Sequence, residues 1–443
     1  MHHYNIVVLG AGIAGTAAAI GLKKLGYHVA VIQQARRFNA IEGLSKRVLQ
    51  GLHHAGCLHA LKTVNAPTPR SVYWNGQHND ANVEHLVERA VFDKGLLADL
   101  GAYDIPIYTG DISKVKEHEE SSQISYKTDQ GTQNITTNFI VEARGRRTPS
   151  QGKALRGIDT LAILLHYRNH HAHIGSQLCS FAEGWAWYAH LPHMPHAYLQ
   201  FSISAHHPAL QGHTKRAELA EHCLQQLPQE FIDQQVLNIE HISARNSTST
   251  LHHEVVSNRM IRIGDAAMAV DPLSGNGVFQ ALSSALIAPS VIHTQLTMPE
   301  NSAIAQQFYA ERIETLFYRF VRIGRDFYRD EQGYNDNEFW QTRQAYPDNE
   351  EAHAAPDPTQ IKIAKKAVVN EGVITEEEVV ISADNPLGIW HIEGIKLAPL
   401  VRYVQQHKIT QSLECQKALS QYFNFTQEQL RPIYQWLKTQ KLM

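Results

Sequence analysis

The chain has few cysteines, little excess charge and no long apolar run. Four of its 443 residues are cysteine and none forms a C-x-x-C motif, which argues against a disulfide framework or a cysteine-based zinc site. The formal net charge is −3, so we expect no nucleic acid partner. No apolar run approaches the ~20 residues that span a membrane, and the first predicted strand leaves no room for a signal peptide. These absences favour a cytoplasmic globular protein without a membrane span.

Histidine, in contrast, is abundant, with 27 residues. Several histidines lie side by side, as in His206-His207 and His252-His253. No spacing matches a metal-binding helix of the H-E-x-x-H kind. We therefore attribute the pairs to composition and predict no metal site.

The order of predicted elements indicates an α/β protein with two or three domains. Residues 5–34 predict a strand, a turn, a helix and a second strand, and residues 105–142 predict a β meander. The sequence pattern changes between about residues 155 and 245, where we expect strands of a second sheet and a helix. Residues 345–358 carry three prolines and predict a linker.

A glycine motif follows the first predicted strand. Gly10-Ala11-Gly12-Ile13-Ala14-Gly15 fits G-x-G-x-x-G, directly after the apolar run Ile6–Leu9 and before a helix. In this setting the backbone approaches a pyrophosphate, and the start of the helix offers free N–H groups and a partial positive charge. The expected contacts come from Gly10, Gly12, Ile13, Ala14 and Gly15; the alternative is a glycine-rich turn without a ligand.

The position expected to hold the adenosine ribose departs from the usual pattern. The second strand of such a unit usually ends in Asp or Glu, whereas this chain has Gln33 and Gln34. An amide accepts a hydrogen bond from a hydroxyl more weakly than a carboxylate does.

A second glycine motif lies far along the chain and suits a flavin. In this motif Asp265 is placed to form a hydrogen bond with a polyol chain, and Gly275 and Gly277 permit close approach to a flat ring. The helix that starts there directs its positive end at that ring and would stabilise the negative charge of a reduced flavin. The expected contacts are Gly264, Asp265, Pro272, Gly275, Asn276, Gly277 and Val278. The two motifs together predict an FAD site.

These motifs, with Glu88-Arg89-Ala90-Val91-Phe92-Asp93 and Val141-Glu142-Ala143-Arg144-Gly145-Arg146, follow the order seen in single-component flavin monooxygenases. Over about residues 1–335 the chain resembles that family, the para-hydroxybenzoate hydroxylase class. The resemblance implies that NAD(P)H reduces FAD and that O2 supplies a hydroxyl group to an aromatic ring. It also places Arg47 near the FAD phosphates or the mobile flavin; the alternative is a solvated helix face.

The family resemblance implies a discontinuous architecture. A Rossmann-like FAD-binding domain would comprise residues 1–155 and 246–340, with a mixed-sheet substrate domain inserted at 156–245. A linker at 341–358 would lead to a small C-terminal domain at 359–443. Within that domain the pattern predicts a strand at 397–402 followed by two helices, which looks like a winged-helix unit that recognises peptides.

A second resemblance is to the flavin-dependent tryptophan halogenases. Gly184-Trp185-Ala186-Trp187, followed by Leu191-Pro192, looks like their W-x-W-x-I-P signature, although the spacing is longer. The sequence of the loop Ser274-Gly275-Asn276-Gly277, in contrast, resembles that of hydroxylases. Lys46 and Lys62 have no context that matches the halogenase catalytic lysine. For the tryptophans, core packing within a strand is the alternative to a catalytic role.

The combined features resemble the flavin monooxygenases that hydroxylate a tryptophan side chain within a precursor quinoprotein during tryptophylquinone maturation. That resemblance implies a protein substrate, such as a subunit of an amine or amino-acid oxidase or dehydrogenase. The alternatives are a halogenase or hydroxylase of a free small aromatic, and a non-catalytic flavin-binding partner. No general base is assigned; the candidates in the substrate domain are Trp187, Tyr188, His166, His190 and Glu183.

Overall fold

The computed structural model describes residues 2–36, 39–149, 154–168, 173–210, 216–228, 231, 238–407, 409 and 412–443. The chain divides into two compact units. Unit 1 comprises Met1–Pro289 and Leu316–Glu350, and unit 2 comprises Ser290–Thr315 and Glu351–Met443.

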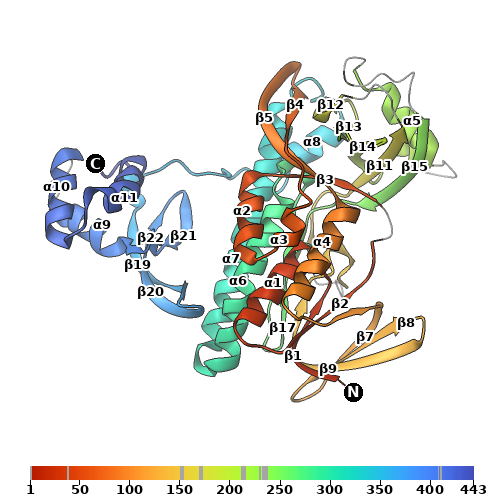
Figure 1. The fold of residues 1–443 in the computed structure, drawn as a ribbon. Helices are drawn as coiled ribbons and strands as arrows, with labels where there is room; N and C mark the ends of the chain where they lie inside the picture. Colours follow the sequence, from red (N-terminus) through yellow and green to blue (C-terminus); the bar gives the residue numbers. More distant parts are fainter. Residues whose placement is uncertain are drawn as a thin grey trace. The chain divides into compact units, whose positions relative to one another are not determined.

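The first sheet of unit 1 has the predicted strand–turn–helix–strand arrangement at its centre (Figure 1). Strand β1 (His2–Leu9) pairs in parallel with β2 (Val29–Gln33) and β9 (Gly131–Glu142), and helix α1 (Ile13–Lys24) connects β1 to β2. The apolar run of β1 is fully buried, as expected for a central parallel strand. The sheet is completed by β6 (Ile107–Thr109), β7 (Asp111–Glu117), β8 (Ser122–Thr128) and β17 (Met260–Arg262).

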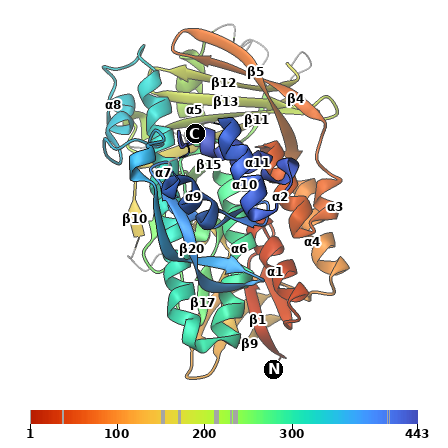
Figure 2. The same ribbon diagram turned by 90° about the vertical axis from the view of Figure 1, so that its left-hand side faces the viewer.

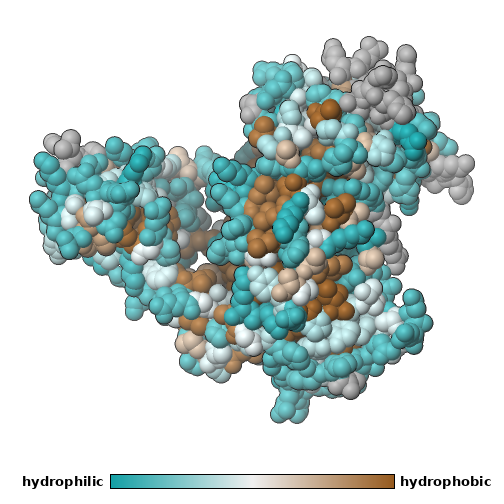
Figure 3. Space-filling model, in the orientation of Figure 1, coloured by the Kyte–Doolittle hydropathy of each residue, from teal (hydrophilic) through white to brown (hydrophobic). Residues whose placement is uncertain are grey.

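Helices pack along this sheet and against one another. Gly56, with φ 90°, ends α2 (Lys46–Ala55) before the short α3 (Leu58–Leu61). Helices α6 (Gly277–Thr297) and α7 (Ser302–Asp330) run alongside one another (Figures 1 and 2). Leu58 of α3 and Val91 of α4 (Arg89–Ala102) stay about half exposed, and hydrophobic residues reach the surface around these helices (Figure 3).

The second sheet of unit 1 runs in the order β15-β11-β14-β13-β12-β4-β5-β3. Its strands from the expected insertion are β11 (Thr160–Arg168), β12 (Gly175–Phe181), β13 (Gly184–His190), β14 (His196–Ser204) and β15 (Asn238–Asn246). The sheet is larger than 156–245, because β3 (Ile41–Leu44), β4 (Pro67–Trp74) and β5 (Gln77–Glu88) join it through the parallel pairing of β4 with β12. Figure 2 shows these strands at the opposite end of unit 1 from β1 and β9. A separate small sheet consists of β10 (Ala154–Arg156), β16 (Thr250–His252) and β18 (Met268–Ala269).

The two faces of this second sheet have different neighbours, because side chains alternate along each strand. Helix α5 (Arg216–Gln225) covers one face, which we call the outer face, in a core that includes Ile163, Tyr188 and Cys223. The opposite face, the inner face, packs Leu164 and Tyr198 against Ile41 of β3.

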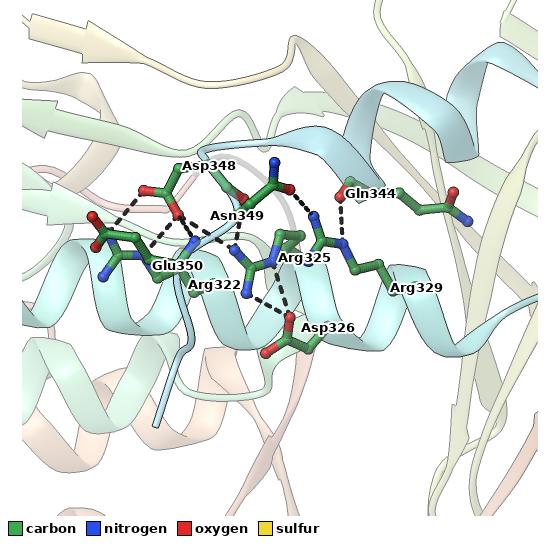
Figure 4. Close-up of polar contacts among 8 residues, drawn as sticks. All are labelled: Arg322, Arg325, Asp326, Arg329, Gln344, Asp348, Asn349 and Glu350. Atoms are coloured by element: carbon green, nitrogen blue, oxygen red, sulfur yellow. Dashed lines mark hydrogen bonds and ion pairs between the residues drawn. The ribbon is translucent and has the colours of Figure 1, made fainter. Parts of the chain in front are cut away.

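Three arginines of α7 hold the segment that leaves α8 (Glu338–Ala345), as Figure 4 shows. They are spaced three and four residues apart and so lie on one side of the helix. The guanidinium of Arg325 is almost fully buried and donates to the carbonyl of Asp348 at 2.6 Å. Further contacts join Arg322 to Asp348 and Glu350, and Arg329 to Gln344 and Asn349. Residues 341–345, at the start of the predicted linker, complete α8.

Unit 2 contains the end of α6 and the start of α7, and its C-terminal segment has strands followed by helices. The strands of that segment are β19 (Lys362–Asn370), β20 (Val373–Ser382), β21 (Asn385–Ile389), β22 (His391–Ile392) and β23 (Ile395–Lys396), and its helices are α9 (Leu397–Gln406), α10 (Ser412–Phe423) and α11 (Gln427–Thr439). The backbone N–H of Ile374 donates to Thr294 Oγ1 at 2.7 Å and fixes β20 to the end of α6.

The predicted strand at 397–402 is wrong, because these residues begin α9. Pro399 lies in the first turn of the helix, where a backbone N–H has no partner within the helix and its loss costs little. The mixed α/β class is confirmed. Among the described residues, no helix is both long and apolar enough to cross a membrane.

Candidate active site

The first glycine motif forms an open cradle at the start of α1. Gly10 has φ +117°, and a Cβ there would lie 2.5 Å from the carbonyl oxygen of Ala143. At Gly12, the N-cap of α1, a Cβ would meet no atom within 4 Å, and no described side chain caps this end of the helix. The cradle therefore offers free space, uncapped N–H groups and the positive end of a helix, which together suit a pyrophosphate.

The second glycine motif lies directly against the first. A Cβ at Gly264 would lie 3.1 Å from that of Ala14 in α1 and 3.4 Å from that of Ala281 in α6. Asp265 follows, and its Oδ2 lies 3.4 Å from Nε of Arg146. Loss of hydration raises the pKa of Asp265, and the charge of Arg146 opposes the rise. We call the two motifs, residues 10–15 and 264–277, the glycine cradle.

The loop before α6 is held by its own hydrogen bonds. Asp271 Oδ1 accepts from the backbone N–H of Leu273 at 2.9 Å, and the Ser274 hydroxyl donates to the carbonyl of Asp271 at 2.9 Å. Gly275 has φ +64°, and a Cβ at Gly275 or at Gly277 would meet no atom within 4 Å. No acidic residue lies in the first turn of α6. A flat ring can therefore approach the loop, with the positive end of α6 directed at it.

The glutamines at the expected ribose position have other partners. Gln33 donates from Nε2 to Thr109 Oγ1 at 2.9 Å, and Gln34 accepts from Arg147. Arg47 is exposed in the first turn of α2, one turn before Gly51, which packs on Leu282 of α6. The roles of Gln33, Gln34 and Arg47 in FAD binding stay predictions.

A network of charges around the buried Arg89 lies beside the cradle, and the sequence motifs gave it no role. Arg89 contacts Glu42 at 2.8 Å and Asp93 at 2.6 Å. Burial opposes ionisation of Glu42, but the charges of Arg89, Arg36 and Arg245 outweigh it and lower its pKa. Arg89 and Asp93 belong to the motif at 88–93, which was the only sequence signal for this network.

Arg245 of β15 connects the second sheet to this charge network. Its guanidinium donates to Gln200 Oε1 at 2.7 Å, and it interacts electrostatically with Glu42 and Asp265. Burial lowers the pKa of Arg245. Trp187 pairs with Gln200 between β13 and β14, and Arg245 pairs with Ala162 between β15 and β11. These pairings place Trp187, Gln200 and Arg245 on the inner face.

Trp185 connects the second sheet to the loop before α6. Its indole Nε1 donates to the Tyr328 hydroxyl at 3.1 Å, which in turn donates to Asp271 Oδ2 at 3.1 Å. Trp185 is 2% exposed and shares a core with Leu273. Core packing therefore accounts for Trp185, whereas Trp187 stays half-buried on the inner face.

The remaining catalytic candidates are distributed over both faces. Tyr188 lies in the outer core and donates to the carbonyl of His173 at 2.7 Å. His190 is buried, with Nε2 at 3.0 Å from the carbonyl oxygen of Met194. His166 contacts the ring of Tyr198 with centroids 4.5 Å apart, and burial lowers its pKa. His166 therefore joins Trp187 on the inner face.

Glu183 lies in the turn between β12 and β13, within a cluster that includes two histidines. Burial opposes its ionisation, but hydrogen bonds from Gln226, His207 and His222 lower the pKa of Glu183 to about 2. The two lysines considered for a halogenase, Lys46 and Lys62, are exposed.

A family model for tryptophan halogenases matches residues 57–371. This chain belongs to the tryptophan halogenase family. A curated member, tryptophan 2-halogenase of Chondromyces crocatus, is 22% identical over 373 residues, which cover 77% of this chain and 70% of that protein.

Solved structures of the tryptophan halogenase family and its neighbours have the same fold. The peptidyl tryptophan dihydroxylase QhpG, essential for tryptophylquinone cofactor biogenesis, is 41% identical, with a TM-score of 0.84 and complete coverage of both chains. The flavin-dependent halogenase CmlS is 14% identical, with a TM-score of 0.73 over 92% of this chain and 89% of that one. The chain is thus a flavin-dependent oxidoreductase of the tryptophan halogenase family, and the open cradle described above fits the flavin.

Proposed function

We propose that this protein is an FAD-dependent monooxygenase that uses NAD(P)H and O2 to hydroxylate a tryptophan side chain of a precursor protein during tryptophylquinone maturation. The observation that carries the proposal is the 41% identity to QhpG over the complete length of both chains. The family model ends at residue 371, so this match extends through the part of unit 2 that follows.

In this proposal the cradle binds the cofactor and the inner face binds the substrate. Gly10, Gly12 and Gly15 hold the pyrophosphate, and Asp265 accepts hydrogen bonds from the ribityl chain. Pro272 and Gly275–Gly277 would pack against the flavin ring, and a bound FAD would supply the redox chemistry that activates O2.

The inner face receives the indole ring. Trp187 offers an aromatic surface beside Gln200, whose carbonyl oxygen is fixed by Arg245. Offset or edge-to-face aromatic contacts orient a ring without a charged partner. Because indole is electron-rich, this proposal needs positioning and exclusion of water more than a general base.

The test is to incubate the purified protein with FAD, NAD(P)H, air and a precursor quinoprotein, which we expect to gain oxygen at one tryptophan. A precursor in which that tryptophan is phenylalanine is the control and stays unchanged. Oxygen or halogen gain on free tryptophan or phenols, with no change in any precursor, would assign the enzyme to small aromatic substrates instead.

A further inference from the structure

The polar cluster on the outer side of the second sheet has the composition of a metal site. Glu183, His207 and His222 offer a carboxylate oxygen and two imidazole nitrogens that all lie within 4.8 Å of one another. Glu183 Oε2 lies 3.1 Å from His207 Nε2 and 2.6 Å from His222 Nε2. Tetrahedral ligands at zinc distances lie roughly 3.3 Å apart, so small side-chain rotations would make room for an ion.

Gln226 brings a fourth polar group to the same point. Its side-chain amide nitrogen contacts Glu183 Oε2 and lies 2.9 Å from His222 Nε2. Gln226 directly follows α5 and lies one helical turn after His222. The four residues thus come from the β12–β13 turn, the segment after β14, and the region of α5.

With Glu183 ionised, no placement of protons makes all three contacts among Glu183, His222 and Gln226 hydrogen bonds. If His222 Nε2 donates to Glu183, it faces the amide hydrogens of Gln226 as a second donor. If it accepts from Gln226 instead, it lies 2.6 Å from the carboxylate as a second acceptor. Turning the amide by 180° places its carbonyl oxygen against the carboxylate. A cation between the four groups removes the conflict, because each of them then serves as a ligand.

We infer that Glu183, His207 and His222 bind a zinc ion, with the carbonyl oxygen of Gln226 or a water molecule as the fourth ligand. Two imidazoles with one carboxylate suit zinc, whereas Ca²⁺ and Mg²⁺ prefer oxygen ligands. The ion ties α5 to the β12–β13 turn on the outer side of the sheet, away from Trp187 on the inner face. Its role is therefore structural: it fixes α5 over the core that contains Leu219 and Cys223.

The inference departs from the prediction of no metal site. Sequence spacing gave no signal, because the three ligands come from separate elements and only the fold brings them together. His206 next to His207, which drew attention in the sequence, instead lies near Asp159 and is 79% exposed.

The experiment measures zinc in full-length, tag-free protein that carries its flavin. After treatment with a chelator, the protein is incubated with zinc chloride, desalted and analysed for metal by mass spectrometry. We expect one zinc per chain in the wild type and in the matched control His206→Ala. His222→Ala should lose roughly tenfold or more in zinc affinity, and Glu183→Gln should do the same.

A second measurement separates zinc binding from misfolding. Zinc should raise the Tm of the wild type and His206→Ala but leave that of His222→Ala unchanged, while flavin absorbance confirms that all three are folded. His222 is 45% exposed, so its replacement should not disturb the core. The inference is overturned if the wild type binds no zinc, or if His222→Ala binds as much zinc as His206→Ala.

Discussion

Backbone geometry builds the glycine cradle, whereas the inner face of the second sheet is built from side chains on separate strands. In the cradle, Gly10 and Gly264 bring the chain close to itself, and Gly12 leaves space for a ligand. On the inner face, strand register alone brings Trp187, Gln200 and Arg245 together. The proposed cofactor site therefore depends on local motifs, whereas the proposed substrate site depends on the register of the whole sheet.

We expect the largest effect on flavin affinity from Gly12→Ala, which alters the cradle alone. The added methyl group would occupy the space proposed for the pyrophosphate, so flavin affinity should fall roughly tenfold to a hundredfold. The matched control is Gly101→Ala in α4, where a Cβ also meets no atom within 4 Å. Flavin absorbance of purified protein and titration with FAD provide the measurement. Equal flavin content in both variants would show that the cradle is not the binding site.

Asp265→Asn should weaken flavin binding and also stabilise the flavin-free protein. Loss of a charge-assisted hydrogen bond predicts roughly a tenfold loss of affinity. The pKa of Asp265 is raised in the folded protein, so its ionised form disfavours folding as pH rises through that value. The Tm of the flavin-free variant should therefore exceed that of the wild type at pH 7, and the gap should close below about pH 4. A gap of the same size at both pH values would contradict this account.

Arg245→Gln should separate the inner face from the cradle. Gln200 would lose the donor that fixes its carbonyl oxygen, so the substrate ring would be held less well. We expect roughly a tenfold loss of product formation with flavin content unchanged. Arg168→Gln, at the exposed end of β11 and paired with Glu240, is the control and should retain turnover. Loss of flavin in Arg245→Gln would place this residue in the cradle instead.

The smallest effect is expected where the two regions meet. Trp185→Phe removes the indole N–H that donates to Tyr328 but keeps the aromatic core. The contact between Tyr328 and Asp271 remains, so the loss is about 1 kcal/mol, or a few-fold in flavin affinity. Titration with FAD measures it, with Trp74→Phe as the control, since Trp74 donates instead to the carbonyl of Phe327. A larger loss from Trp74→Phe would show that Trp185 is not the specific link.

The cradle could be predicted from the sequence because its determinants are local. A strand, a glycine turn and a helix follow one another within residues 6–24, and the second motif precedes α6 directly. The break at Gly56 was predictable for the same reason, since glycine adopts the positive φ that ends α2.

Features that depend on distant partners were not predicted. Prolines at 67 and 69 obscured β4, which forms because β12 offers it a parallel partner. The apolar run at 397–402 suits a strand or a buried helix equally well, and packing in unit 2 selects the helix. Arg245 lies in an ordinary strand, and only pairing with β11 brings it to the inner face.

The most direct test of the proposed function is tandem mass spectrometry of a precursor quinoprotein after reaction with FAD, NAD(P)H and ¹⁸O-labelled O2. The account predicts that one tryptophan of the precursor gains labelled oxygen, and that the gain requires this enzyme. Halogen incorporation, oxygen derived from water, or an unchanged precursor together with oxidised free aromatics would contradict it.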